Sequence, residues 1–410
     1  MKLSLQFSKI NKKSAIAISG SKSETNRLLL LQALYNNISL DNVSNSDDSE
    51  VMTKALVSND NLKDIHHAGT AMRFLTAYFA TQEGKDVMLT GSSRMKERPI
   101  SILVEALRQL GAVIEYTENE GFPPLKITGQ KITQNKVTMP ANVSSQYISA
   151  LLLIAPKLEN GLELTLDGEI TSIPYIKMTL TLLNEIGVAT SFMENKITVA
   201  PKSLMQSNQQ LTVESDWSSA SYWYSIIALS EIGTEVTLSS YKQNSLQGDS
   251  ALATIYKDFG VETVFKDDHS IIISKTATHN SQLITHNLNN CPDIAQTIAV
   301  TCFGLSVGCH LTGLHTLKIK ETDRLEAVKA ELEKLGASIL VTNDSLTLET
   351  GGEINNGVAI KTYQDHRMAM AFAPLALRTS IIIEEAGVVS KSYPDFWKDL
   401  KSAGFIMTEL

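Results

Sequence analysis

A short segment near the N-terminus has residue types suited to binding an anion. It reads Gly20-Ser-Lys-Ser-Glu-Thr-Asn-Arg27 and joins a strand-like apolar run, residues 15–18, to a helix-like apolar run, residues 28–34. The first backbone N–H groups of a helix have no intrahelical acceptor and carry partial positive charge. A Lys and an Arg beside them would add full charges. The segment therefore predicts a phosphate-binding helix start.

The same segment also has a purely structural interpretation. Ser21 and Glu24 fit a capping box, in which each side chain bonds the other residue's backbone. Lys22 and Arg27 would then be two solvated cations on a capped helix. This segment alone does not decide between the two interpretations.

Further cations with few acidic neighbours in the sequence recur along the chain. In Lys-Glu-Thr-Asp-Arg324, the cations Lys320 and Arg324 would share one face of a helix, with Glu321 pointing elsewhere. A solvated helix start is the alternative, because single surface charges are common. The other candidates are Arg98 in Arg94-Met-Lys-Glu-Arg-Pro99, Arg367 in Asp365-His-Arg367 and Lys391 in Ser-Lys-Ser-Tyr-Pro-Asp395.

Composition limits the classes of function. The chain has 410 residues, 43% of them hydrophobic and 20% charged, which is typical of a globular protein with two or three domains. A net charge of -8 argues against general nucleic-acid binding and is compatible with a small anionic ligand. Residues 1–14 have no apolar leader core, and no apolar run reaches the length of a membrane span. We expect a cytoplasmic monomer without membrane or nucleic-acid partners.

Metal and nucleotide sites are not indicated. Cys291, Cys302 and Cys309 are spaced neither as a disulfide framework nor as a zinc site, so we expect buried thiols. The histidines form no metal-binding pattern, and we expect neither a metal nor another cofactor. Glycine-rich motifs for dinucleotides or nucleoside triphosphates are missing from the sequence.

Two kinds of amphipathic or apolar segment recur about every 75 residues. The first kind ends in Gly111, Gly187, Gly260 and Gly336, at spacings of 76, 73 and 76 residues, and each is followed by two short strand-like runs. A glycine just after a helix favours the left-handed backbone conformation. We therefore predict four helices that end at these glycines.

The second kind is apolar nearly all round and begins with small or polar residues. Its members start near Gly69, Ser144, Ser218, Asp293 and His366, with Lys22 beginning a sixth. Helices apolar on all sides are buried, so their polar N-termini must find internal partners or a ligand. The alternative to a ligand site is that duplicated units keep these polar helix caps for stability alone.

The repeat predicts an α/β fold of two similar domains. Each domain would contain three βαβαββ units, with buried helices whose N-termini face an interdomain cleft. Residues 1–19 with 215–410 would form one domain and residues 20–214 the other, with hinges near Ser19 and Glu214 and closure on ligand binding.

Nine ordered segments resemble the 5-enolpyruvylshikimate-3-phosphate synthase family. They are GSKSETNR, AGTAMR, RMKERPI, SSQYISALL, SSASY, CPDIAQTIA, KETDRL, YQDHRMAMA and KSYPDF, and they span nearly the whole chain. The resemblance implies two domains of three βαβαββ units. It also implies transfer of the enolpyruvyl group of phosphoenolpyruvate to shikimate 3-phosphate, with release of phosphate and without a metal or organic cofactor.

The resemblance also implies two sets of binding residues. The phosphoenolpyruvate set is Lys22, Gly69, Arg98, Gln146, Arg324, Arg367 and Lys391. The shikimate 3-phosphate set is Ser23, Arg27, Ser144, Ser145, Gln146, Ser172, Tyr175, Asp293 and Lys320. The cations in these sets suit two substrates that carry phosphate and carboxylate charges.

Proton transfer requires a base for the 5-hydroxyl and an acid for the enol methylene. The resemblance assigns these catalytic roles to Asp293 and Glu321, with Lys22 as a third catalytic residue. Cations beside Glu321 would lower its pKa, so partial burial or a relay through Lys22 or His366 would be needed to keep a proton available.

Several positions depart from the family pattern. His67 stands where Asn is usual before Ala-Gly69, and Phe74 replaces a common Pro in the same helix. Thr316 replaces an Asn that often contacts the substrate phosphate. Ser215 and Trp217 replace Gly and Ala, and we interpret Trp217 as a packing residue. Since Gly69 is retained, the resemblance implies inhibition by glyphosate at the phosphoenolpyruvate site.

Three alternatives remain open. The related transferase acting on UDP-N-acetylglucosamine usually has a loop Cys where this chain has the Cys-free segment 94–99. A non-catalytic anion-binding protein would leave Asp293 and Glu321 unexplained, since acids beside an anion weaken binding. RNA 3′-phosphate cyclisation would require a nucleotide site and a less acidic protein.

Overall fold

The chain folds into two compact units. The computed structural model describes residues 1–170, 173–202, 207–278 and 283–410. One unit comprises Met1–Ser19 and Glu214–Leu410, and the other Gly20–Val213. Glu214 belongs with the first unit, one residue away from the expected boundary, because its carboxylate accepts hydrogen bonds from Trp217, Lys242 and Ser245 of that unit.

One arrangement of four strands recurs in both units. In its plainest form β16 (Leu283–Asn287) runs parallel to β17 (Gly308–Thr312), β19 (Leu346–Leu348) pairs antiparallel with β17, and β18 (Ile339–Val341) pairs antiparallel with β19. The order in the sheet is therefore first, second, fourth, third. Helix α10 (Ala295–Gly304) joins the parallel strands and α11 (Arg324–Lys334) follows β17.

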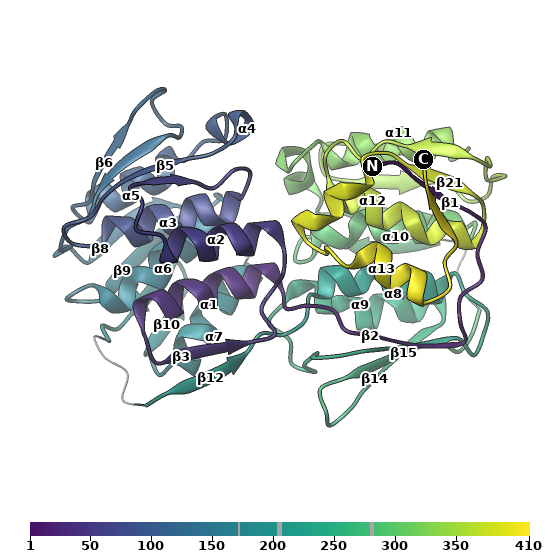
Figure 1. Cartoon of the computed structure of the whole chain (residues 1–410), viewed down its shortest axis with the longest axis horizontal. Helices are drawn as coiled ribbons and strands as arrows, with labels where there is room; N and C mark the ends of the chain where they lie inside the picture. The colour runs from purple at the N-terminus through teal and green to yellow at the C-terminus, as the bar shows by residue number, and fades with distance from the viewer. Residues whose placement is uncertain (171–172, 203–206, 279–282) are drawn as a thin grey trace. The chain divides into compact units, whose positions relative to one another are not determined.

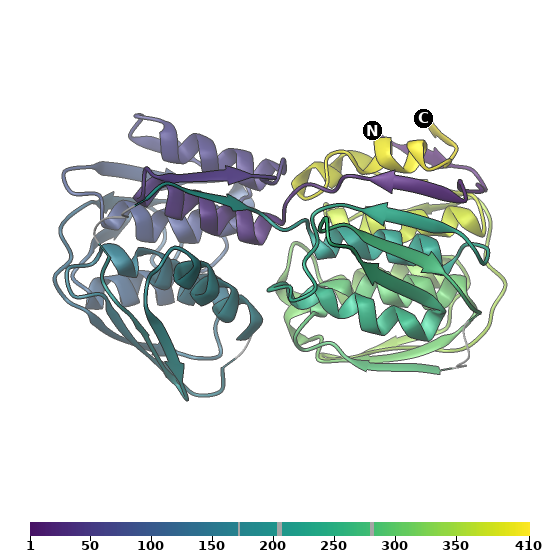
Figure 2. The same ribbon diagram turned by 90° about the horizontal axis from the view of Figure 1, so that it is seen from below.

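The first unit contains three such sheets, and the N-terminal segment completes two of them. β1 (Leu3–Leu5) takes the fourth position between β21 (Ile381–Ile383) and β22 (Met407–Glu409), with β20 (Val358–Ile360) at the edge. β2 (Lys13–Ile16) runs parallel to β13 (Glu235–Leu238), as Figure 2 shows. In that sheet β15 (Ile271–Lys275) pairs antiparallel with β13, and β14 (Val261–Phe265) pairs antiparallel with β15 at the edge.

The second unit has two four-stranded sheets with the same order. They are β4 (Leu62–Asp64), β5 (Asp86–Thr90), β7 (Leu125–Thr128) and β6 (Val113–Tyr116), and β8 (Lys136–Pro140), β9 (Leu162–Asp167), β11 (Lys196–Val199) and β10 (Thr190–Met193). Its third sheet has two strands in the described part of the chain, β3 (Ile38–Asp41) and β12 (Gln209–Thr212). Only residues 58–61 separate α2 (Asp47–Val57) from β4, which is too short for the expected second strand pair.

Six inner helices form the core of the two units (Figure 1). They are α1 (Lys22–Leu34), α3 (Gly69–Ala80) and α6 (Ser145–Ile154) in the second unit, and α8 (Trp217–Ala228), α10 and α12 (His366–Phe372) in the first. Every described residue of α8, α10 and α12 except Ser218 is buried. All six begin at or within three residues of the positions predicted from the sequence, which confirms the inner-helix repeat.

The outer helices end at the predicted glycines. Gly111, Gly187, Gly260 and Gly336 have φ angles of 101°, 75°, 70° and 103°, the left-handed conformation that glycine adopts without strain. They follow α5 (Ser101–Gln109), α7 (Ile173–Glu185), a broken helix made of α9 (Leu252–Ile255) and the 3-10 turn η3 (Tyr256–Phe259), and α11. The remaining helices are α4 (Ser93–Lys96) and α13 (Phe396–Ser402).

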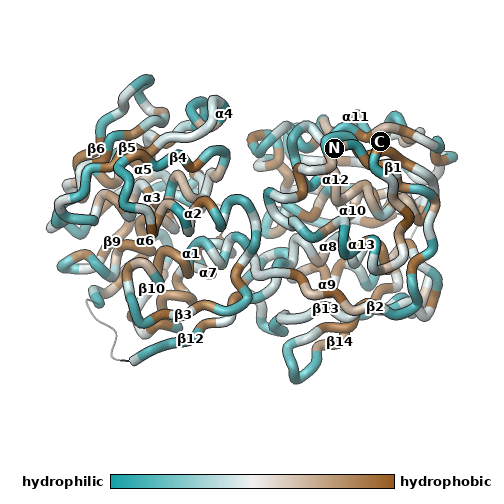
Figure 3. The backbone as a smooth tube through the Cα atoms, in the orientation of Figure 1, coloured by the Kyte–Doolittle hydropathy of each residue, from teal (hydrophilic) through white to brown (hydrophobic). Residues whose placement is uncertain are grey.

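Burial agrees with the hydropathy of the sequence. Brown, hydrophobic stretches fall mainly on the strands and inner helices, and teal stretches mainly on the connecting loops (Figure 3). Trp217 is 0% exposed, which confirms that it is a packing residue. Cys291, Cys302 and Cys309 are buried free thiols, as expected. Among the described helices, none is both long and apolar enough to cross a membrane.

Candidate active site

Arg27 is a buried cation whose hydrogen-bond acceptors are neutral. Its Nε donates to Thr179 Oγ1 at 2.8 Å, Nη2 to Ser149 Oγ at 3.0 Å and Nη1 to the Ser23 carbonyl at 2.6 Å. These partners come from the outer helix α7 and the inner helices α6 and α1, so packing of these three helices fixes the guanidinium. Burial lowers the pKa of Arg27 to about 10, and it stays protonated at neutral pH.

Two aromatic rings accompany the Arg27 guanidinium. Its central carbon lies 5.5 Å from the Phe74 ring centre and 5.8 Å from that of Tyr175. This geometry is within the range of a cation–π contact. Phe74 therefore contacts Arg27, a residue predicted to bind shikimate 3-phosphate. Ser172, predicted for the same ligand, lies outside the described residues.

The start of α1 differs from the predicted capping box. Ser21 is the residue before the helix, but its side chain makes no capping hydrogen bond, so the capping-box prediction is wrong. Lys22 Nζ lies 3.6 Å from Asp48 Oδ2, and His67 Nε2 lies 3.9 Å from the other oxygen of the same carboxylate. Asp48 is 7% exposed, so this ion pair is partly protected from solvent.

The starts of α3 and α6 lie together. Gln146 Nε2 donates to Thr70 Oγ1 at 3.1 Å, and Ser144 Oγ caps α6 by accepting from the Gln146 backbone N–H at 3.4 Å. Ser145 follows, with 8% of its surface exposed. The hydroxyls of Thr70, Ser144 and Ser145, the Gln146 amide and the N-termini of α3 and α6 thus form a group of polar contacts suited to an anion.

Arg98 lies over the start of α3. An ideal Cβ built on Gly69 would be 2.6 Å from Arg98 Nη1, so only glycine permits this approach. One turn on, Arg73 is 4% exposed and donates to the carbonyls of Gly69 and Pro99. Burial, and then the charge of Arg98, lower the pKa of Arg73 to about 10. Two arginines thus converge on one helix start, which favours an anionic ligand there.

In the first unit Arg324 is the centre of a buried ionic cluster. Its side chain is 2% exposed, and it donates from Nε to Asp365 at 2.6 Å, from Nη1 to Asp293 at 2.8 Å and from Nη2 to Glu321 at 2.7 Å. Asp323 caps α11, so the helix begins at Arg324 and the guanidinium is held at its first turn. The cluster joins three predicted site segments of the first unit, those that contain Asp293, Arg324 and Asp365.

Asp293 is shared by three cations. Arg324 Nη1 lies 2.8 Å, Arg367 Nη2 3.3 Å and Lys320 Nζ 3.5 Å from its carboxylate oxygens. Burial alone would raise the pKa of Asp293, but Arg367, Lys320 and Arg324 together hold it well below its usual range. Asp293 is therefore ionised at neutral pH.

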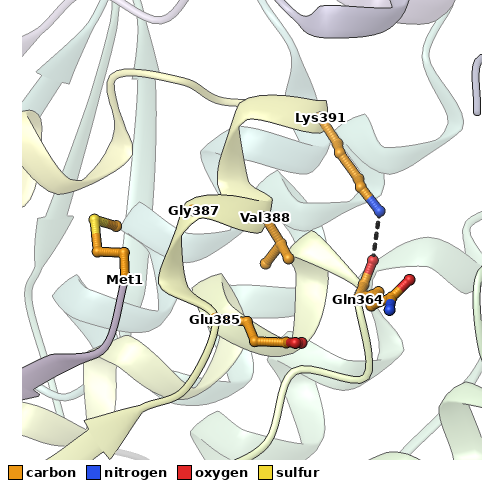
Figure 4. Close-up of a pocket in the computed structure, with 6 residues that line it drawn as sticks. All are labelled: Met1, Gln364, Glu385, Gly387, Val388 and Lys391. Carbon is orange, nitrogen blue, oxygen red and sulfur yellow. Dashed lines mark hydrogen bonds between the residues drawn. The ribbon is translucent and has the colours of Figure 1, made fainter. Parts of the chain in front are cut away.

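Lys391 lines a pocket of the first unit. Its Nζ donates to the backbone carbonyl of Gln364 at 2.7 Å (Figure 4). The pocket, about 400 Å³, is also lined by Met1, Glu385 and Val388. Gln364 is three residues before Arg367, so one backbone segment connects the two predicted phosphoenolpyruvate ligands.

Folding gives these cations acidic partners that the sequence does not show. Arg324, Arg367 and Lys22 each pair with a carboxylate from another segment of the chain. The prediction that Lys320 and Arg324 share a helix face is wrong, since Lys320 ends the 3-10 turn η5 (His315–Ile319) and the helix starts at Arg324. They meet at Asp293 instead, and Glu321 turns back to Arg324.

Sequence reasoning missed several residues of this site. Asp365 stands in the quoted DHR motif and is 0% exposed, but it was not given a role. Asp249 bonds Ser218 beside Arg367, and no motif pointed to it. Thr179 and Ser149, which hold Arg27, lie on inner and outer helices at positions that only packing reveals.

Comparison with known proteins identifies a family. The model for EPSP synthase (3-phosphoshikimate 1-carboxyvinyltransferase) matches residues 54–400. A 3-phosphoshikimate 1-carboxyvinyltransferase of Bacteroides fragilis (strain YCH46) is 48% identical over 398 residues, covering 96% of each chain. One of Colwellia psychrerythraea is 37% identical over 414 residues, covering 94% of this chain and 95% of the relative.

Solved structures support the same fold. An EPSP synthase from Acinetobacter baumannii matches 100% of both chains with a TM-score of 0.82 and 21% identity. An enolpyruvyl transferase from Streptomyces tendae matches 99% of this chain and 98% of its own, with a TM-score of 0.73 and 14% identity. Both likenesses concern the fold, and they agree with the predicted α/β class of repeated units.

Proposed function

Because the chain belongs to the EPSP synthase family, we propose that its two groups of site residues bind phosphoenolpyruvate and shikimate 3-phosphate for the enolpyruvyl transfer of the shikimate pathway. The observation that carries the assignment is Asp293, an ionised carboxylate held by three cations. An acid in a group of anion-binding cations weakens simple binding, and proton transfer gives it a purpose.

We assign the phosphate group of shikimate 3-phosphate to the residues around Arg27. This cation is buried with neutral acceptors, and Ser144, Ser145 and Gln146 add hydroxyl, amide and helix N-terminal donors. Ser23 lies in the first turn of α1 and Tyr175 beside the Arg27 guanidinium. Lys320 and Asp293 of the other unit are assigned to the hydroxyl and carboxylate end of the same substrate.

The phosphoenolpyruvate residues are divided between the units. Lys22, Gly69, Arg98 and Gln146 belong to the second unit, and Arg324, Arg367 and Lys391 to the first. Each unit alone therefore carries an incomplete set. Arginine suits this role because its planar fork of donors matches phosphate and carboxylate.

In the proposed addition step, the 5-hydroxyl oxygen bonds C2 of phosphoenolpyruvate while its proton goes to the Asp293 carboxylate. The methylene carbon C3 takes a proton from Glu321, and a tetrahedral intermediate results. In the elimination step C3 returns its proton to Glu321, the bond from C2 to the phosphate oxygen breaks, and the departing phosphate takes up the proton held by Asp293. The enol ether and inorganic phosphate leave, and both carboxyl groups are back in their starting states.

Substrate charge tunes the proposed base. In the free protein Arg367, Lys320 and Arg324 depress the pKa of Asp293, which makes it a poor proton acceptor. Bound phosphate and carboxylate groups would share these cations, so their pull on Asp293 weakens and its pKa rises. The base would thus become effective only when both anionic substrates are present. The substrate anions would also compete with Glu321 for Arg324, which lies 2.7 Å from the Glu321 carboxylate, and so would weaken that ion pair.

The reaction is tested by measuring phosphate release with both substrates and with each one omitted. We expect release only when both are present, without added metal. Asp293→Ala should remove most of the turnover, while Asp268→Ala, a change at an exposed carboxylate of the same unit, should not. Equal or greater turnover with UDP-N-acetylglucosamine in place of the shikimate ester would reject the proposed acceptor.

A further inference from the structure

Asp249 is a buried acid for which the proposed reaction has no role. It is 6% exposed and lies in the 3-10 turn η2 (Gly248–Ala251), which packs on α8. Gln247 fixes this turn, because its side chain accepts from the Trp217 backbone N–H and donates to the Ser215 carbonyl, both at 2.9 Å. Asp249 is therefore held at the start of α8.

Ser218 connects Asp249 to the proposed site. Its hydroxyl donates to Asp249 Oδ2 and accepts from Arg367 Nη2 at 3.3 Å. A hydroxyl has one proton, so donating it to Asp249 leaves the oxygen lone pairs for Arg367. An ionised Asp249 thus sets the direction of the Ser218 hydroxyl.

Arg367 has few other side-chain contacts that fix it. Nη2 also lies 3.3 Å from Asp293 Oδ2, and Nη1 donates to the Asp293 carbonyl at 3.1 Å. Its Nε is buried and has no hydrogen-bond partner in the described part of the chain. Without Ser218, every hydrogen bond and ion pair between this guanidinium and the described residues would go to Asp293. It could then pivot about that residue.

We propose that Asp249 is a positioning residue that orients Ser218, and through it the Arg367 guanidinium, for phosphoenolpyruvate. The proposal rests on the assignment of Arg367 to phosphoenolpyruvate made above. Asp249 does not touch the substrate in this scheme. It acts by fixing the guanidinium before the substrate arrives, which reduces the ordering needed on binding.

The charged and titratable neighbours of Asp249 come from three elements. Asp216 precedes α8, Asp293 and Cys291 lie at the start of the α10 segment, and Arg367 lies on α12. Burial, and then the charge of Asp293, raise the pKa of Asp249 to about 6, against the lowering effect of Arg367 and Ser218. Protonation below this pH removes the negative charge that attracts the Ser218 proton and adds an O–H donor at Asp249, so the direction of the Ser218 hydroxyl is no longer fixed.

The test compares Asp249→Asn, Ser218→Ala and the double variant with the wild type. In each variant we expect the KM for phosphoenolpyruvate to rise about tenfold, the effect of one hydrogen bond to a charged group. The kcat and the KM for shikimate 3-phosphate should change much less. The double variant should be no worse than either single one, because both act through one connection.

The pH profile separates positioning from general damage. Phosphoenolpyruvate itself titrates near pH 6, so the ratio of variant to wild-type KM is the quantity to follow between pH 5.5 and 8. We expect the ratio for Asp249→Asn to fall toward one below pH 6, where wild-type Asp249 is neutral. Asp268→Asn is the matched control, since Asp268 also accepts from a serine, Ser270, but on an exposed turn.

Three results would overturn the proposal: an unchanged KM in both single variants, additive effects in the double variant, or a KM ratio constant with pH. The wild type is assayed in the same series. An inactive wild type would reject the proposed function together with this inference. Unaltered variants beside an active wild type would reject this inference alone.

Discussion

The guanidinium of Arg98 occupies the space that a side chain on Gly69 would need. An ideal Cβ at residue 69 would lie 2.6 Å from Nη1 and 3.1 Å from the central carbon of Arg98. A distance below 3.0 Å requires a shift, and the atom that must move is the far end of a flexible side chain. The helix can therefore accept alanine, but Arg98 cannot stay where it is.

We therefore predict that Gly69→Ala folds normally and raises both the KM for phosphoenolpyruvate and the inhibition constant for glyphosate. Both ligands would lose the contact of the displaced Arg98. Glyphosate is the longer molecule and should lose more, because the methyl group also takes space at the helix start. Competitive inhibition measured across a phosphoenolpyruvate series checks this prediction.

A double-variant cycle with Arg98→Lys tests whether Arg98 carries the effect. If the methyl group acts by displacing Arg98, Gly69→Ala should matter less for the KM of phosphoenolpyruvate in the Arg98→Lys background. Independent, additive effects would show that Arg98 is not the route. Equal losses for glyphosate and phosphoenolpyruvate would contradict the role given to ligand length.

Arg27→Lys is predicted to be a damaging change despite its conserved charge. The guanidinium donates through three different nitrogens to Thr179, Ser149 and the Ser23 carbonyl. A lysine ammonium is a single point and cannot reproduce this fork. We expect the KM for shikimate 3-phosphate to rise about tenfold or more, since charge-assisted hydrogen bonds contribute roughly 1.5–3 kcal/mol.

Steady-state kinetics with each substrate varied in turn checks this prediction. Lys157→Arg is a suitable control, because Lys157 contacts the Tyr35 ring in the same unit and has no assigned role in the site. A larger change in the KM for phosphoenolpyruvate than in that for shikimate 3-phosphate would contradict the assignment of Arg27.

Much of the fold could be predicted because it depends on local signals. Inner helices are marked by long apolar segments, and outer helices by the glycines that end them, such as Gly111 and Gly336. Strand pairing across the chain is not a local signal. The position of β1 between β21 and β22, and the reduced third sheet of the second unit, follow from contacts between residues far apart in sequence.

The site shows the same division. Motifs identified the cations and two of their acidic partners, Asp293 and Glu321, but not Asp48 or Asp365. Asp48 lies 26 residues from Lys22 and pairs with it at 3.6 Å, while Asp365 lies 41 residues from Arg324 and bonds it at 2.6 Å. Asp249 was missed for a further reason, because it acts through Ser218 and stands in a segment without any motif.

Asp293→Ala and Glu321→Ala are predicted to lower kcat more than they weaken substrate binding. Both carboxylates are assigned to proton transfer, so their loss should appear mainly in the transition state. Removing Asp293 also frees charge on Arg367, Lys320 and Arg324, which favours rather than opposes anion binding. Calorimetric titration with each substrate measures binding directly. Variants that have simply lost binding would show that neither residue is an acid or base.

The final prediction concerns stability and Asp249. Its pKa in the folded protein is raised to about 6 by burial and by Asp293, whereas an unfolded aspartate titrates near 3.9. Between these values the folded state holds the proton more tightly than the unfolded state. The free energy of unfolding therefore falls as pH rises from about 4 to 6. Above pH 6 the whole destabilisation caused by the buried Asp249 charge is present.

Asp249→Asn removes this charge, so we expect it to raise the free energy of unfolding at pH 7.5 by about 1–3 kcal/mol. The gain should shrink as pH falls toward 4. Tryptophan fluorescence is a selective probe, because all three tryptophans, Trp217, Trp223 and Trp397, lie in the first unit together with Asp249. A variant that is more stable but has a higher KM for phosphoenolpyruvate would show that the buried charge is kept for function. If Asp249→Asn is less stable than the wild type at pH 7.5, Asp249 serves the fold instead.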